Sequence, residues 1–183
     1  KSDQIGVTDT EIQVGGVVSK TNPIGIDPAA AGDGIRAYFN KVNSQGGIYG
    51  RKLVLKTIRD DKSANNQTEI QGLIAQDNVF AAMPLGTLLF TGAQDLTDAG
   101  VPGFGWNINT EYSGKDNLFA ETGALCVGET CPGHFAPWLA KEAGATKVGV
   151  LAFSIEQSLV CATAYQAGFK KFGGDVVFYD TSV

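Results

Sequence analysis

The sequence predicts an α/β fold built on a doubly wound parallel sheet, and three observations support this. Strand-like and helix-like stretches alternate along the chain, double glycines end two of the helix-like stretches, and residues 12–58 form a complete strand–helix–strand unit. A helix that connects two parallel strands packs on one face of their sheet. We therefore expect loops that hold small ligands at the carboxyl ends of the strands.

The first part of the chain has the clearer pattern. Asp33 can cap a helix that turns Ile35, Phe39 and Val42 to one side, and Gly46-Gly47 ends it. Ser63 opens the next helix in the same way. The expected elements are strands at 12–19, 52–58, 79–83 and 101–106, with helices from Asp33 to Gly46, from Ser63 through Ile74, and at 88–99.

The alternation breaks at residues 107–117, which are polar and lack an apolar period. We interpret this stretch as a loop and crossover, with a domain boundary near residue 118. The expected elements after it are helices at 133–143 and 156–172 and strands at 147–153 and 175–179. Because two parallel strands with two helices make a poor core by themselves, we expect the 119–183 part to be incomplete or to dock on a partner.

Composition excludes several classes of protein. The net charge of −5 and the scattered 14 Lys and Arg residues argue against nucleic-acid binding. No apolar run approaches the roughly 20 residues that span a bilayer. No signal peptide is visible in the sequence. The opening Lys1-Ser2-Asp3 has the character of a mature or trimmed start.

No motif for catalysis, a cofactor or a metal stands out. The glycines of residues 100–105 have the wrong spacing for a dinucleotide fingerprint, and no phosphate-binding Gly-Lys-Ser/Thr occurs. His134 is the only histidine and has no orienting neighbour in sequence. Asp60-Asp61 lacks further oxygen ligands at loop spacing, so we interpret it as a solvated strand end. We expect no enzyme activity, no cofactor and no metal.

The loop at residues 84–87 is the best candidate for a binding site. It joins a buried strand to a predicted helix start, and Gly86 lets a ligand approach the backbone. The N–H groups of Thr87 and Leu88, with the Thr87 hydroxyl, can hold a carboxylate there. The alternative is that Thr87 simply caps the helix with nothing bound.

The next strand end favours the binding interpretation. It adds Asn107 and Asn109, so two neighbouring strand ends offer polar groups. Such a pair of loops at one edge of a parallel sheet is typical of a ligand site.

Four stretches together resemble a known family. They are residues 8–16 (Thr-Asp-Thr-Glu-Ile-Gln-Val-Gly-Gly), 34–52 (ending Gly-Gly-Ile-Tyr-Gly-Arg-Lys), 84–87 (Pro-Leu-Gly-Thr) and 99–102 (Ala-Gly-Val-Pro). These are similar to the branched-chain amino acid type of ABC-transporter solute-binding proteins, which have the type I periplasmic-binding-protein fold. The stretches 131–133 and 158–161 are similar to actinobacterial members.

The resemblance implies two α/β lobes that close on a ligand like a hinge. It implies a first lobe over residues 1–118 without its C-terminal return, and a partial second lobe over 119–183. In such proteins the loop that matches Leu85, Gly86 and Thr87 holds the carboxylate of the ligand. The strand end that matches Asn107 to Asn109 binds its amino group.

The resemblance also places the walls of the site. The aromatic wall residue of the first loop falls at Asp27, and the lid residue of the second lobe falls at Gln157, so both positions are polar here. Trp106 adds a large apolar face beside Asn107. An aromatic acid, an amide or a polyol-like solute therefore fits as well as an amino acid.

The function that we expect is extracytoplasmic binding of a small solute for ABC-type uptake, in the periplasm or on a cell-surface lipoprotein. The expected partners are that solute, a membrane permease, and the remainder of the second lobe, either missing from this chain or supplied by a separate one. The alternative is a ligand-sensing domain of a receptor or regulator, because the same fold serves there.

The three cysteines, Cys126, Cys131 and Cys161, fit no zinc pattern. In an oxidising compartment they allow one disulfide and one free thiol, whereas three buried thiols would suit the cytosol. A Cys126–Cys131 bond would close a short loop. A Cys131–Cys161 bond would join two helix starts, and we favour it over the shorter pairing.

Overall fold

The computed structural model describes residues 3–106, 108–120 and 135–183, and these fall into two compact units. Unit 1 lies within residues 1–106 and 114–121, and unit 2 within residues 107–113 and 122–183. Each unit contains a sheet of its own.

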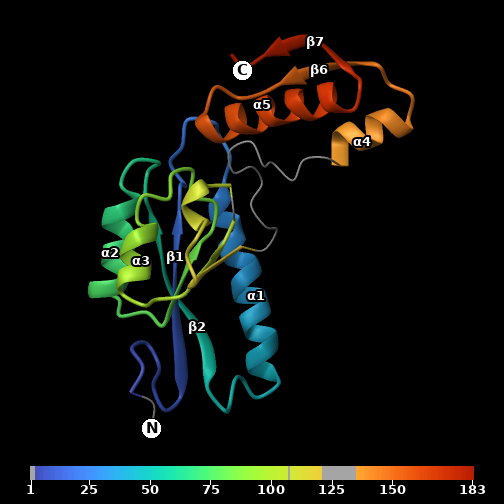
Figure 1. Cartoon of the computed structure of the whole chain (residues 1–183). Helices are drawn as coiled ribbons and strands as arrows, with labels where there is room; N and C mark the ends of the chain where they lie inside the picture. The colour runs from blue at the N-terminus through green and yellow to red at the C-terminus, as the bar shows by residue number, and fades with distance from the viewer. Residues whose placement is uncertain (1–2, 107, 121–134) are drawn as a thin grey trace. The chain divides into compact units, whose positions relative to one another are not determined.

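Unit 1 is a five-stranded parallel sheet with strand order β2-β1-β3-β4-β5 and helices on both faces (Figure 1). Helix α1 covers one face beside β1 and β2, while α2 and α3 lie on the other face. The strands are β1 (Glu11–Val18), β2 (Lys52–Asp60), β3 (Ala81–Pro84), β4 (Gly103–Gly105) and β5 (Leu118–Ala120), and the helices are α1 (Ala31–Ser44), α2 (Asn66–Ala75) and α3 (Ala93–Asp98). This is the doubly wound parallel sheet that the sequence predicts.

The core of unit 1 is centred on β1. Val17 and Val18 of this strand are at most 1% exposed. A Cβ on Gly15 would lie only 2.6 Å from a methyl carbon of Leu73, a fully buried residue of α2. The missing side chain of Gly15 therefore lets α2 pack closely against the middle of the sheet.

Several predicted boundaries were wrong. Helix α1 begins at Ala31, so Asp33 lies in its first turn and does not cap it. Helix α2 begins at Asn66 because Lys62 and Ser63 have φ angles of 51° and 59°, which a right-handed helix cannot contain. The helix expected at 88–99 is only α3, and β5 was not predicted at all.

Unit 2 contains two parallel strands, β6 (Lys147–Leu151) and β7 (Asp175–Asp180), with helices α4 (Phe135–Glu142) and α5 (Glu156–Lys171). These elements match the predicted alternation. Few apolar side chains are buried here: Leu151 is 65% exposed and Val177 is 61% exposed. The described part of unit 2 therefore has the poor core that the sequence predicts.

The Cys161 thiol on α5 is free within the described residues, and because Cys131 lies outside them the Cys131–Cys161 disulfide stays a prediction. Burial raises the pKa of this thiol, which favours its unreactive protonated form. Cys126, Cys131 and His134 lie outside the described residues. A Cys126–Cys131 bond stays a prediction.

None of the helices within the described ranges is long and apolar enough to cross a bilayer.

The Asn43 side chain joins the end of α1 to the start of β2. Its Nδ2 donates to the Leu53 carbonyl at 2.9 Å, and the Leu53 N–H donates to its Oδ1 at 2.8 Å. We predict that Asn43→Ala lowers the free energy of unfolding by about 1–3 kcal/mol, because both Leu53 groups lose their partner in a half-buried position. Urea denaturation measures this loss. Asn40→Ala, an exposed change on the same helix, is the control, and equal losses for the two variants would contradict the prediction.

Candidate functional site

Three loops of unit 1 meet at the carboxyl edge of its sheet, because all five strands run in the same direction. They follow β1 (residues 19–27), β3 (residues 85–92) and β4 (Trp106). Strand β1 lies between β2 and β3, so the connection after β1 leads to one face of the sheet and the connection after β3 to the other. Such a switch point leaves a crevice between the two loops, and it is where open α/β sheets bind ligands.

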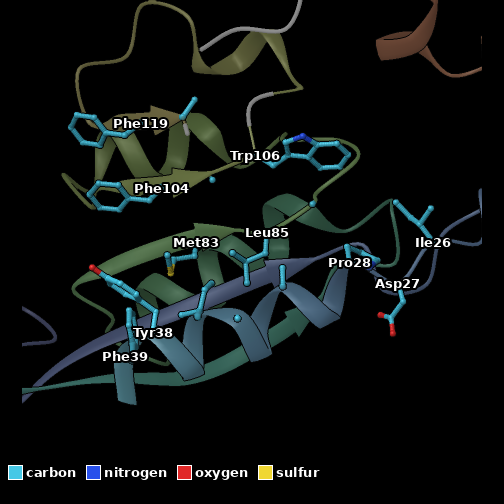
Figure 2. Close-up of a pocket in the computed structure, with 16 residues that line it drawn as sticks. Ile26, Asp27, Pro28, Tyr38, Phe39, Met83, Leu85, Phe104, Trp106 and Phe119 are labelled. Carbon is cyan, nitrogen blue, oxygen red and sulfur yellow. The ribbon is translucent and has the colours of Figure 1, made fainter. Parts of the chain in front are cut away.

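A cavity of about 760 Å³ opens at this point. Its mouth is formed by Asp27 and Pro28 from the connection after β1, by Leu85 and Gly86 after β3, and by Trp106 after β4 (Figure 2). The rest of its wall is lined by apolar side chains of α1 and of β3 to β5. The structure thus brings four of the predicted site residues, Asp27, Leu85, Gly86 and Trp106, to one cavity in unit 1.

Gly86 is the point of closest approach between the backbone and the mouth of this cavity. Its φ angle is 114°, and a Cβ there would lie 2.7 Å from Pro28 Cβ and 3.6 Å from Trp106 Cε3. Within the described residues, no hydrogen bond from the Gly86 N–H is found. Gly86 is buried and its carbonyl accepts from the Ser19 N–H at 3.4 Å, so it brings a backbone without a side chain into the cavity wall between Pro28 and Trp106.

The neighbours of Gly86 differ from the prediction. Leu88 donates its N–H to Ser19 Oγ at 3.0 Å, so the predicted role of this N–H in holding a carboxylate is wrong. No helix begins at Thr87 or Leu88 either, because α3 starts at Ala93. Thr87 is 2% exposed, with its hydroxyl 3.4 Å from the Val17 carbonyl oxygen, and it does not line the cavity. A contact between Thr87 and a solute stays a prediction.

A buried carboxylate behind the loop was missed by the sequence reasoning. Asp61 is 0% exposed and accepts hydrogen bonds from Ser19, Ser63 and Asn66, so its interpretation as a solvated strand end was wrong. The adjacent Asp60 is more accessible and ties down the loop after β1. The only signal in the sequence was the Asp-Asp pair itself, which does not tell which carboxylate points inward.

Asp60 orders the loop that leads from β1 to the cavity. Its two oxygens accept from the N–H and the hydroxyl of Thr21 at 3.2 and 2.8 Å. Partial burial works to raise the pKa of Asp60, but the hydrogen bonds from Lys62 and Thr21 outweigh it and lower the pKa below its usual value. The carboxylate therefore stays ionised, as its role of acceptor requires.

Asp27 has a structural role as well as a place in the cavity wall. It is exposed, and its Oδ1 accepts from the Ala29 N–H at 3.1 Å, which caps the short 3-10 turn Pro28–Ala30 ahead of α1. A residue at this position thus fixes the start of α1 and faces the cavity at the same time.

Two predicted site residues lie in unit 2 and contact each other. Gln157 Nε2 donates to Asn109 Oδ1 at 3.0 Å, and Asn109 is 6% exposed. Asn107 lies outside the described residues. In the described part of the chain, no group of three or more His, Cys, Asp or Glu is arranged to hold a metal ion.

The family model for periplasmic binding proteins matches residues 11–182 of this chain. A comparison with curated proteins gives no significant match. Three similar solved structures are a branched-chain amino acid transporter substrate-binding protein from Streptococcus pneumoniae with isoleucine, a solute-binding protein of an ABC transporter from R. palustris with benzoate, and a fatty acid ABC transporter substrate-binding protein from Thermomonospora curvata.

These likenesses establish the fold over almost the whole chain. The identities are 20%, 18% and 18%, and the TM-scores are 0.74, 0.71 and 0.69, in the order just given. The matches cover 95%, 94% and 99% of this chain but only 50%, 48% and 47% of the others. The chain therefore spans about half the length of the solved structures that it matches.

Gly86 can be tested without a ligand. We predict that Gly86→Ala lowers the free energy of unfolding by about 1–3 kcal/mol more than Gly46→Ala does, because its Cβ overlaps Pro28. Gly46 has a similar φ of 104° but open space around it, so its replacement should cost only the roughly 1–2 kcal/mol of the left-handed backbone. Urea denaturation of both variants measures the difference. Equal losses would show that Pro28 does not close over Gly86.

Proposed function

Because the chain belongs to the periplasmic binding protein family, we propose that it binds a small solute outside the cytoplasm for delivery to an ABC-type importer. The observation that carries this proposal is the Gly86 backbone, which lines the cavity without a side chain between Pro28 and Trp106 and has no hydrogen bond from its N–H within the described residues. A backbone donor beside an aromatic face is suited to holding a solute, and nothing in the proposal requires the protein to transform it.

We propose a solute that carries a carboxylate. The names of the three similar structures include isoleucine, benzoate and a fatty acid, and all three compounds have this group in common. In the proposed site, the Gly86 N–H and the Thr87 region receive the carboxylate, and Trp106 packs against the apolar part of the solute. The motifs at residues 34–52 and 84–87 favour the branched-chain amino acid type, and the cysteine-bearing stretches favour an actinobacterial source.

Because Asp27 and Gln157 are polar, an aromatic acid is proposed to fit the site as well as a leucine-like amino acid does. Asp27, a residue of the cavity wall, stands where the amino acid binders are expected to have a ring, and its carboxylate accepts from the Ala29 N–H. Gln157, the proposed lid residue, uses its side-chain amide on Asn109. Asn107 and Asn109 are the proposed contacts for an amino group, and Gln157 is the proposed contact of the second lobe. The proposed carboxylate-bearing solute is therefore an amino acid or an aromatic acid, with an amide-like solute as the alternative.

We propose that residues 1–118 and 119–183 belong to the two lobes of the family, which close on the solute by a hinge. The chain spans about half of the similar structures, and the poor core of unit 2 agrees with an incomplete second lobe. The partners are therefore the solute, the remainder of the fold and a membrane permease.

Among the described residues, unit 1 has a partly exposed apolar face, formed by Tyr38, Met83, Phe104 and Phe119 on the side of the cavity away from Asp27 (Figure 2), and Ile35 lines the same cavity. Tyr38 is 63% exposed, and Phe104 and Phe119 are 43% and 48% exposed, with their rings stacked at 5.0 Å between centroids. Parallel sheets in proteins are normally covered on both faces. We propose that the polypeptide that completes this fold covers this face, since the similar chains are about twice as long.

The alternative function is a ligand-sensing domain of a receptor or regulator, because the same cavity would serve it. The two functions differ in what the bound solute causes. Deletion of the gene should stop uptake of the labelled solute if the protein serves an importer, and should change gene expression but not uptake if it serves a sensor.

Solute binding can be located with the tryptophans. The 183 residues contain two, Trp106 and Trp138. Replacing Trp138 by Phe, together with every tryptophan in the rest of the gene product, leaves Trp106 as the only emitter. We predict that isoleucine, benzoate or decanoate changes Trp106 fluorescence when titrated into this variant of the full-length gene product. The analogues without a carboxylate, isoleucinol, benzyl alcohol and decanol, should bind about tenfold or more weakly, because a hydrogen bond to a charged group contributes about 1.5–3 kcal/mol. Calorimetry supplies the dissociation constants.

Two results would contradict this proposal. The first is equal affinity for a carboxylate and its matched alcohol, which would show that the Gly86 N–H does not bind the carboxylate. The second is binding that leaves Trp106 emission unchanged but alters Trp138 emission in the reciprocal variant Trp106→Phe, which would place the solute elsewhere.

The covering of the apolar face predicts different dye binding by two forms of the protein. The 183-residue chain expressed alone should bind the apolar dye ANS strongly, because the exposed Phe104 and Phe119 rings offer it a surface. Replacing both by Ser should reduce that fluorescence, and the full-length gene product should show little. Strong dye fluorescence from the full-length product that the double variant abolishes would contradict the proposal.

A further inference from the structure

The buried carboxylate of Asp61 does not line the cavity, yet it is linked to the loop that does. We propose that Asp61 is a positioning residue, which fixes the loop after β3 through Ser19 and Asn66 and thereby sets the affinity for the solute. This inference rests on the proposed function, because it concerns the same site.

The Asp61 carboxylate is the acceptor at the centre of a buried network. Its Oδ1 accepts from Ser19 Oγ at 2.7 Å and from the Ser63 N–H at 2.9 Å, and its Oδ2 accepts from Asn66 Nδ2 at 3.1 Å. Ser19 and Asp61 are 0% exposed, and Asn66 is 1% exposed. Because water is excluded, each of these hydrogen bonds depends on the others for its partners.

The network ends on two amides of the loop after β3. The Leu88 N–H donates to Ser19 Oγ at 3.0 Å, and the Gly92 N–H donates to Asn66 Oδ1 at 2.9 Å. Ser19 comes from the end of β1 and Asn66 from the first turn of α2, so the loop is held from two different elements. Residues 86–92 contain no helix or strand of their own.

The Asp61 carboxylate determines which atoms of Ser19 and Asn66 face the loop. We call the two hydrogen bonds from Leu88 to Ser19 and from Gly92 to Asn66 the clamp. An ionised carboxylate can only accept hydrogen bonds. The single hydroxyl hydrogen of Ser19 therefore points to Asp61, which leaves an oxygen lone pair for Leu88. The amide of Asn66 likewise turns its NH₂ to Asp61 and its oxygen to Gly92. A neutral amide in place of Asp61 would remove this constraint.

The clamp acts next to the point where the solute is proposed to bind. Gly86 lies two residues before Leu88, and its carbonyl oxygen is 3.4 Å from the Ser19 nitrogen. Its φ angle of 114° is open to glycine but fixed only by what holds the loop. Loosening Leu88 therefore gives the Gly86 backbone more freedom to move in the cavity wall, where the solute is proposed to bind.

A charge-conserving swap tests the direction of these bonds. In Asp61→Asn alone, the new NH₂ faces the NH₂ of Asn66, so either that contact or the bond to Gly92 is lost. In the double variant Asp61→Asn with Asn66→Asp, every bond has a donor and an acceptor again. Asn43→Ala, which removes side-chain to backbone bonds at the opposite edge of the sheet, is the matched control for a loss of stability.

We expect Asp61→Asn to raise the dissociation constant of the full-length gene product for isoleucine, benzoate or decanoate about tenfold, and the swap to restore most of it. Amide exchange of Leu88 and Gly92 without solute should become about tenfold faster in Asp61→Asn and return in the swap. Asn43→Ala should change neither. If Asp61→Asn does not fold, Ser19→Ala takes its place, with faster exchange of Leu88 and weaker binding.

Three results would overturn the inference: unchanged affinity in Asp61→Asn, a swap that restores neither affinity nor amide exchange, or loop exchange that Asn43→Ala accelerates equally. If none of the three solutes binds the unaltered protein, the proposed function fails on its own. The amide exchange measurements then test separately whether Asp61 holds the loop. Unchanged exchange of Leu88 and Gly92 in Asp61→Asn would overturn that part of the inference.

Discussion

All five strands of unit 1 run in the same direction, and this constraint decides where the protein can bind anything. Parallel pairing brings the loops after β1, β3 and β4 to a single edge, and the position of β1 between β2 and β3 separates the first two loops to form a crevice. The cavity mouth at Pro28, Gly86 and Trp106 follows from that arrangement. None of these residues is close in sequence to the other two.

In the candidate site, a residue without a side chain, Gly86, is followed by a loop that hydrogen bonds hold in place. Gly86 has no Cβ and a left-handed backbone, so it could adopt many conformations in an isolated peptide. Ser19 and Asn66, both oriented by Asp61, hold the amides that follow it. A buried carboxylate is costly unless every acceptor position is used, and in return it gives the neighbouring polar groups one defined orientation.

The alternation of apolar strands and amphipathic helices was enough to predict the parallel sheet, its helices on both faces and the position of the Gly86 loop. It was not enough to predict β5, because Leu118–Ala120 is only three residues long and is stabilised by pairing with β4. Helix α3 was predicted too long because the N–H groups of Leu88 and Gly92 donate to Ser19 and Asn66, which are distant in sequence, and not to a helix.

The candidate site was predictable in its backbone and less so in its side chains. Gly86 was found because a glycine directly after a buried strand indicates a close approach to the backbone, whereas the Leu88 N–H was assigned to a carboxylate although Ser19 accepts it. Asp61 escaped notice because burial depends on tertiary packing. Asp60 and Asp61 have the same chemistry, and only the course of the chain after β2 separates the surface carboxylate from the buried one.

The Gly86 amide is proposed to hold the solute at the edge of a parallel sheet, and every other part of the site depends on this contact. A crystal structure of the full-length gene product with its bound solute tests it most directly. We expect a solute carboxylate oxygen within about 2.7–3.2 Å of the Gly86 nitrogen, with the rest of the solute against Trp106. A solute bound elsewhere, with the Gly86 nitrogen facing only water or protein, would contradict this.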